Sequence, residues 1–159
     1  MKVKIIYPKW KKLEGQTTFN LPPHGPVVFA ATLPDYVDVS FIDENVEDIN
    51  FDESADLIAI SMMLTIQVKR GWEIAAEYKE RGIPTICGGI ATMLHAEECQ
   101  QHMDSVFLGE AEGRMEEVLN DLKNNSLKEI YNFRQQLPPI ESVGTARRDI
   151  LNRELYNHK

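Results

Sequence analysis

The chain has 159 residues, of which 43% are hydrophobic and 26% are charged, and its net charge at pH 7 is -8. This length fits one domain of about 100–200 residues, and the ordinary balance of residue types excludes a disordered chain. The acidic charge argues against a nucleic-acid partner, which needs clustered excess lysine and arginine, and no apolar run approaches the roughly 20 residues of a membrane span.

The cellular location is indicated by the N-terminus and the cysteines. The apolar stretch that follows Met1 is far too short for a signal peptide. The two cysteines, Cys87 and Cys99, have no paired spacing and form neither a disulfide framework nor a cysteine-rich metal site. We therefore expect a cytoplasmic protein.

The first half of the chain predicts three strands and one short helix. Residues 2–8 form a short apolar run with β-branched side chains, ended by proline, and predict the first strand. A proline at the first helical position predicts a helix over 25–33. Alternating apolar and polar residues predict a second strand over 37–43, and the unbroken apolar run 57–60 predicts a third, buried on both faces.

Two polar connections separate these first elements. Residues 9–23 form a loop of a length that is often functional in compact domains. Residues 43–56 are acidic and polar, and Phe51 is expected to hold this connection against the domain.

The second half of the chain alternates helices with strands. The expected elements are a helix carried by Val68, Gly71, Ala75 and Tyr78, a strand over 85–87, a short helix over 97–102, a strand over 105–108, and an amphipathic helix from Met115 to about Asn124. Strands that alternate with helices pair in parallel through right-handed crossovers. The sequence therefore predicts a flavodoxin-like, doubly wound sheet of five parallel strands in three α/β/α layers.

In such a fold the ligand crevice lies at the carboxyl ends of the strands, between the first and third strands. Three segments follow strands at this edge, and we expect them to contact a cofactor: Ser61, Met62, Met63 and Thr65; Gly88, Gly89 and Ile90; and Gly109, Glu110, Ala111 and Glu112. Hydroxyls bind the polar part of a ligand, methionines offer soft apolar contact, and glycines let the backbone approach a bulky group.

Each segment also has a purely structural interpretation. Ser61 and Thr65 are suited to cap the helix that follows them. A tight turn explains one of the paired glycines, and a helix dipole at a helix start favours Glu110 and Glu112. The joint position of the three segments at successive strand ends favours the functional interpretation.

The sequence lacks the residues that several other activities of this fold class would need. A phosphoryl-accepting receiver domain needs aspartate and lysine where Ser61 and Gly109 stand, and residues 9–15 make a poor phosphate loop for a flavin. No dinucleotide or P-loop glycine motif, histidine metal-ligand spacing or nucleophile motif is present. We therefore predict no catalytic residue and no protein metal ligand in this chain.

A series of short segments runs in a fixed order from Lys2 to Tyr156. They are Tyr7-Pro8, Pro22-Pro23-His24-Gly25, Asp56-Leu57-Ile58-Ala59-Ile60-Ser61 with Thr65, Lys79-Glu80-Arg81-Gly82-Ile83-Pro84, Gly88-Gly89-Ile90, Glu97-Glu98, Gly109-Glu110-Ala111-Glu112 and Leu127-Lys128-Glu129-Ile130-Tyr131. In this order they resemble the N-terminal cobalamin-binding domain of cobalamin-dependent radical SAM proteins. Members similar to the magnesium-protoporphyrin monomethyl ester oxidative cyclase share the layout.

The resemblance implies a module that positions cobalamin for methyl transfer or oxidative cyclisation. Ser61 and Thr65 would meet the nucleotide tail of the cofactor, while Gly88-Gly89 and Gly109 would let it pass near the backbone. Pro138-Pro139 and Ala146-Arg147-Arg148-Asp149-Ile150-Leu151 are similar to the connector that leads to the radical SAM barrel in this family. We therefore expect a cobalamin-binding domain over 1–131 and a connector over 132–159. The barrel, its [4Fe-4S] cluster, S-adenosylmethionine and the catalytic step would lie outside this chain.

The sequence departs from other cobalamin domains in its axial ligand. Domains of the methionine synthase and mutase type carry Asp-x-His-x-x-Gly after the first strand, and nothing between Pro8 and Gly25 matches it. The resemblance therefore implies base-off cobalamin without a lower histidine ligand. His24 has a position at the start of a helix that favours capping or packing, and Ala91 and Thr92 stand where relatives carry a histidine.

Two alternatives belong to other classes of function. The first is a structural domain that docks on the barrel and has lost corrin binding, for which Gly89→Trp would leave activity normal. The second is a separate flavin or nucleotide binder, which would need a phosphate loop that the sequence does not offer.

Overall fold

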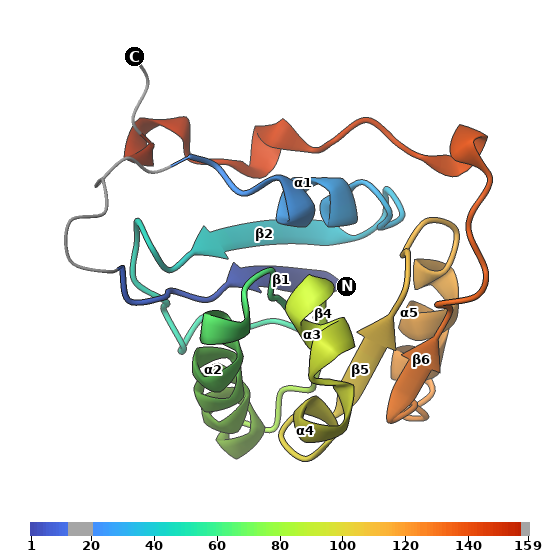
Figure 1. Ribbon diagram of the computed structural model, residues 1–159, viewed down its shortest axis with the longest axis horizontal. Helices are drawn as coiled ribbons and strands as arrows, with labels where there is room; N and C mark the ends of the chain where they lie inside the picture. The colour runs from blue at the N-terminus through green and yellow to red at the C-terminus, as the bar shows by residue number, and fades with distance from the viewer. Residues whose placement is uncertain (13–20, 157–159) are drawn as a thin grey trace.

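The computed structural model describes residues 1–12 and 21–156, so the central part of the loop expected over 9–23 lies outside the described residues. The sheet has six strands in the order β2-β1-β3-β4-β5-β6, and each pair of neighbours is parallel (Figure 1). The strands are β1 (Lys2–Tyr7), β2 (Asp38–Asp43), β3 (Leu57–Ser61), β4 (Thr85–Gly88), β5 (Ser105–Leu108) and β6 (Ile130–Asn132). The flavodoxin-like class is confirmed.

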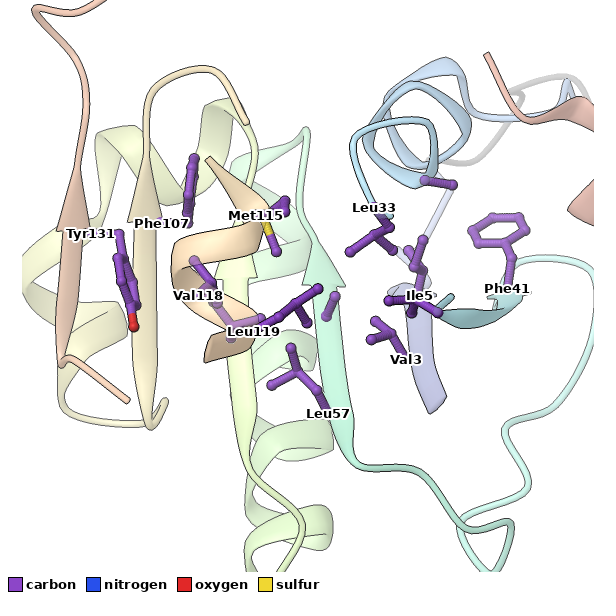
Figure 2. Packing of buried hydrophobic residues seen from close by; sticks show 14 of the residues in the cluster. Val3, Ile5, Leu33, Phe41, Leu57, Phe107, Met115, Val118, Leu119 and Tyr131 are labelled. Atoms are coloured by element: carbon purple, nitrogen blue, oxygen red, sulfur yellow. The ribbon is translucent and has the colours of Figure 1, made fainter. Parts of the chain in front are cut away.

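Helices cover both faces of this sheet. They are α1 (His24–Ala30), α2 (Val68–Glu80), α3 (Ile90–Leu94), α4 (Ala96–Gln100) and α5 (Met115–Lys123), with short 3-10 turns η1 (Thr65–Gln67), η2 (Ile140–Ser142), η3 (Arg148–Ile150) and η4 (Arg153–Leu155). Because side chains alternate along a strand, β1 sends Ile5 into the core under α1 and α5 and Ile6 into the core under α2, α3 and α4. Figure 2 shows the first of these cores, to which Leu33, Leu57 and Met115 belong, between the helices and the sheet.

The connection between β2 and β3 is irregular, as the sequence predicts. Its apolar residues Ile49, Phe51 and Ala55 pack on the core under α2, and the Phe51 ring lies 5.2 Å from that of Tyr78. Beneath it Lys4 is fully buried, with its ammonium 2.8 Å from a carboxylate oxygen of Glu53. The connection therefore takes the covering role that a crossover helix has in other doubly wound sheets.

The structure contains two elements that the sequence did not reveal. The sheet has a sixth strand, not five, because β6 has only three residues at the edge and too few apolar positions to show a period. Helix α3 starts directly after Gly89 and is five residues long, which is also too short for a helical period. No helix among residues 1–12 and 21–156 is long and apolar enough to cross a membrane.

The chain after β6 crosses the molecule above α1 and returns to the β2 edge (Figure 1). The Arg147 amide donates a hydrogen bond to the Val27 carbonyl at 2.8 Å, and Ile150 and Leu151 pack against the core. Tyr156 is buried, and its hydroxyl donates to the Asp43 carboxylate at 3.2 Å. Residues 144–156 thus form a strap that holds α1 against the sheet.

Candidate functional site

A cavity of about 330 Å³ opens at the carboxyl ends of β3, β4 and β5, between the sheet and helices α1 and α5. This size lies within the range of small-molecule sites, about 300–1,000 Å³. The lining residues are His24, Gly25, Val28, Phe29, Thr32, Ala59, Ile60, Ser61, Ile86, Cys87, Gly88, Gly89, Phe107, Gly109, Glu110, Ala111, Glu112 and Met115. The cavity lies at the strand edge that the sequence predicts, but over β3 to β5 and not between the first and third strands, because no residue of β1 is among its described lining residues.

Ser61 brings a hydroxyl to this cavity from the end of β3. Leu57 and Ala59 of the same strand belong to the core under α1 and α5, and alternation places Ser61 on that same face. A Cβ added at Gly25 would lie 3.8 Å from the Ser61 Oγ, so this hydroxyl faces the first turn of α1. The Ser61 hydroxyl has no hydrogen-bond partner among the described residues, so it is available to a ligand.

The paired glycines after β4 have different roles. Gly89 has φ +101°, and a Cβ there would lie 2.4 Å from the Met62 carbonyl oxygen, so the protein itself requires this glycine. A Cβ at Gly88 would make only ordinary contacts with Phe107, at 3.9 and 4.0 Å. Gly88 follows Ile86 on the same strand face, so a longer side chain there would project into the cavity.

Gly109, like Gly89, has a backbone conformation and close backbone neighbours that leave no room for a side chain. It has φ +109°, and a Cβ would lie 2.7 Å from the carbonyl carbon of Phe133. The close approach joins the end of β5 to the chain that leaves β6, because the Phe133 amide also donates to the Leu108 carbonyl at 2.7 Å. Packing within the protein therefore explains this glycine without a ligand.

Glu110 and Glu112 lie in the loop before α5 and outside its first turn. That helix begins at Met115, and its acidic first-turn residues are Glu116 and Glu117. The helix-start explanation of Glu110 and Glu112 is therefore wrong. Glu110 is exposed at the rim of the cavity, whereas Glu112 is 9% exposed and lines it.

The capping interpretation of Ser61 and Thr65 is also wrong, because Gln67 supplies the cap. The fully buried Gln67 accepts hydrogen bonds from the Met63 and Leu64 amides, both at 2.9 Å, through its side-chain oxygen. Its side-chain nitrogen donates to the Pro8 carbonyl at 2.6 Å. One amide side chain thus joins the loop after β3 to the loop after β1.

Four of the sequence-predicted residues do not line the cavity. Met62 is fully buried under α2, beside Gly71, and Thr65 lies with its hydroxyl 3.3 Å from the His95 ring. Met63 and Ile90 are 53% and 61% exposed. The predicted site residues that do line the cavity are Ser61, Gly88, Gly89, Gly109, Glu110, Ala111 and Glu112.

The wall formed by α1 was missed from the sequence. Val28, Phe29 and Thr32 line the cavity from this helix, and Phe107 and Met115 line it from β5 and α5. Their apolar character marks core residues equally well, so no local signal separates them from ordinary packing. Only the placement of α1 across the strand ends assigns them to the site.

A charged network stabilises the neighbouring strand ends. Glu44, next to β2, receives hydrogen bonds from Arg70 at 2.6, 2.9 and 3.0 Å and from the Lys9 amide at 3.1 Å. Burial by itself would raise the pKa of Glu44, but the hydrogen bonds from Arg70 and Lys9 outweigh burial and lower it. The network joins the loop after β1 to α2 through Glu44.

The sequence was also compared with known proteins. A bacteriochlorophyllide d C-8(2)-methyltransferase from Chlorobaculum tepidum is 32% identical over 117 residues, which are 73% of this chain. The chain is similar to a methyltransferase. The matched part is 26% of that relative, so this chain spans about a quarter of its length. No family model and no solved structure matches the chain.

Proposed function

We propose that this chain is the cobalamin-binding module of a radical SAM enzyme that carries out methyl transfer or oxidative cyclisation. The observation that carries the proposal is the cavity at the strand ends, with a serine hydroxyl on one side and an unobstructed glycine, Gly88, on another. It lies at the carboxyl ends of the parallel strands, the edge at which doubly wound sheets bind ligands, over β3 to β5 and not at the switch point between β1 and β3. The similarity to a named methyltransferase supports the proposal, since methyl transfer is one of the reactions that the resemblance implies.

The size of the cavity indicates which part of cobalamin it would hold. A volume of about 330 Å³ suits a nucleotide base with its ribose, and it is far too small for the corrin ring. The walls from Val28, Phe29 and Ile86 are apolar and suit an aromatic base. The corrin would therefore remain outside, at the strand ends.

The charge of the cavity supports the same orientation. The described lining residues include two glutamates and no lysine or arginine, which disfavours a buried phosphate. The phosphodiester of the nucleotide tail would accordingly stay near solvent, with the base directed inwards. The same lack of cationic residues weighs against the alternative of a separate flavin or nucleotide phosphate binder.

In this proposal the residues of this chain bind and orient, while bound cobalamin supplies the cobalt chemistry. The Ser61 hydroxyl would hydrogen-bond the ribose or base, and Gly88 would leave room for the base. Gln67 would keep the loop after β3 in position. The catalytic barrel, its [4Fe-4S] cluster and S-adenosylmethionine would belong to a longer polypeptide.

The proposal is tested by titrating the purified chain with hydroxocobalamin and following the visible spectrum. We expect saturable binding with a base-off spectrum, and at least a tenfold weaker affinity for Gly88→Leu, which fills the cavity. Gly88→Ala is the matched control, because its Cβ meets only ordinary contacts. Gly89→Trp is unsuitable as a probe, because any side chain at Gly89 collides with the Met62 backbone.

Two results would contradict the proposal. No spectral change at high micromolar cofactor would favour the alternative of a structural docking domain. Equal affinities of the wild type and Gly88→Leu would mean that cobalamin binds elsewhere on the surface.

A further inference from the structure

The side chain of Glu112 is largely buried, and its carboxylate has no partner among the residues that the structure describes. It is 9% exposed, it lines the cavity, and neither of its oxygens has a hydrogen bond or an ion pair among residues 1–12 and 21–156. Other buried carboxylates of this chain are paired: Asp43 accepts hydrogen bonds from Asn45 and Tyr156, and Glu44 pairs with Arg70. Because its oxygens are not among the fully buried unpaired polar atoms of the described residues, they remain accessible to a donor from outside the chain.

The position of Glu112 is set by the fold and not by its own contacts. Gly109 approaches the Phe133 backbone, and the Arg114 guanidinium lies 4.7 Å from the centre of the Phe133 ring. These two contacts hold both ends of the loop over 109–114. The backbone that carries Glu112 is therefore held beside the cavity before a ligand arrives, which lowers the entropic cost of a hydrogen bond to a ligand.

From this arrangement we infer that Glu112 selects ligands that carry a hydrogen-bond donor, N–H or O–H, on the part that enters the cavity. This inference rests on the proposed function, in which that part is the nucleotide base of a corrinoid. Dimethylbenzimidazole, the base of cobalamin, has no donor when it is linked to ribose. The ribose hydroxyls are donors that both corrinoids share, so only the base distinguishes them. Adenine carries an amino group, which gives Glu112 a donor that the base of cobalamin lacks.

The other residues that line the cavity suit an uncharged base that donates a hydrogen bond to Glu112. Phe29, Ile86 and Phe107 offer apolar surface to a planar ring, and no lysine or arginine is among the described lining residues to pair with Glu112. A hydrogen bond to a charged group contributes about 1.5–3 kcal/mol, which corresponds to at least about a tenfold difference in affinity. The chain should therefore prefer the adenine cobamide over cobalamin by that factor or more.

The test compares the dissociation constants of adeninylcobamide and cobalamin for the 159-residue chain, measured by visible spectroscopy. The wild type is expected to prefer adeninylcobamide at least tenfold. In Glu112→Gln, whose amide is uncharged and also donates, the preference should fall below about threefold. Glu129→Gln makes the same change of charge at an exposed residue away from the cavity and should keep the wild-type preference.

The outcomes separate this inference from the proposed function. Equal affinity of the wild type for the two corrinoids, or a preference unchanged in Glu112→Gln, overturns the selection by Glu112 while corrinoid binding stands. Absence of binding by either corrinoid overturns both. Thermal melting of each variant without ligand shows whether a loss of affinity arises from unfolding.

Discussion

At the scale of single residues, the glycines of the strand ends show how one sequence feature can have two causes. Gly88 and Gly89 are adjacent and chemically identical, yet the protein backbone requires only Gly89. A Cβ at Gly88 would make no close contact with the backbone, and Gly88 borders the cavity. A substitution at one position therefore tests the stability of the fold, and a substitution at the other tests the ligand site.

We expect Gly89→Ala to lower the free energy of unfolding by about 2–3 kcal/mol, because alanine would be strained at positive φ and would press on Met62. Gly88→Ala should change it by less than about 0.5 kcal/mol. Urea denaturation of the two variants gives the comparison. Equal stabilities would mean that the backbone at Gly89 rearranges without cost.

At the scale of elements, the connection over 44–56 is held to β1 by charge. Glu53 accepts hydrogen bonds from Lys2 at 2.7 Å and lies 2.8 Å from the buried ammonium of Lys4. The hydrogen bonds from Lys2 and Lys4 lower the pKa of Glu53 to about 2. A carboxyl whose pKa is lower in the folded state stabilises the fold above its unfolded pKa of about 4.5, and this contribution disappears as the pH falls through about 2.

Glu53→Gln should therefore reduce stability at pH 7 and flatten its pH dependence between about pH 4.5 and 2. Because Glu53 is 38% exposed, solvent screening limits the carboxylate contribution to about 1 kcal/mol, or about 3 °C in Tm. Thermal melts at several pH values measure it, with Glu80→Gln on the exposed side of α2 as the control. If the melting temperature of Glu53→Gln varied with pH as that of the wild type does, Glu53 would not be the group responsible for the loss of stability at low pH.

Among the elements, the long ones follow from the sequence and the short ones do not. Helices α2 and α5 have apolar residues at helical spacing, with buried positions such as Ile74, Tyr78 and Val118, and they were predicted. The first four residues of β3, Leu57 to Ile60, form the apolar run expected of a strand that is covered on both faces, and they were recognisable in the sequence. Helix α3 and strand β6 have too few residues for a period, and their structure depends on contacts with the neighbouring strands.

At the scale of the whole molecule, the strap over 144–156 links the far end of the chain to the cavity. The strap contacts α1 through the hydrogen bond from the Arg147 amide to the Val27 carbonyl. Gly144 also lies close to the end of α1, since a Cβ added at Gly144 would be 3.3 Å from the Ala31 carbonyl oxygen. Helix α1 has only seven residues and forms one wall of the cavity. A helix of this length depends on tertiary contacts for its stability.

Removal of residues 144–159 should consequently loosen α1 and leave the centre of the sheet intact. We expect amide hydrogen exchange in α1 to become at least about tenfold faster, while amides of β3 and β4 stay protected. A chain that ends at Tyr156 is the control, since it keeps the buried tyrosine and its bond to Asp43. Unchanged exchange in α1 would show that the sheet alone holds this helix.

The sequence by itself determined the class of fold and the sheet edge along which the candidate cavity lies. Alternating strand and helix patterns imply parallel pairing, and parallel pairing brings the segments after β3, β4 and β5 to one edge. Whether each residue of those segments meets a cavity was decided by the tertiary structure. Packing of the Met62 and Phe133 backbones explains Gly89 and Gly109, and the position of α1 creates the wall that encloses Ser61 and Glu112. These contacts join residues that are far apart in the chain, so a local sequence pattern cannot predict them.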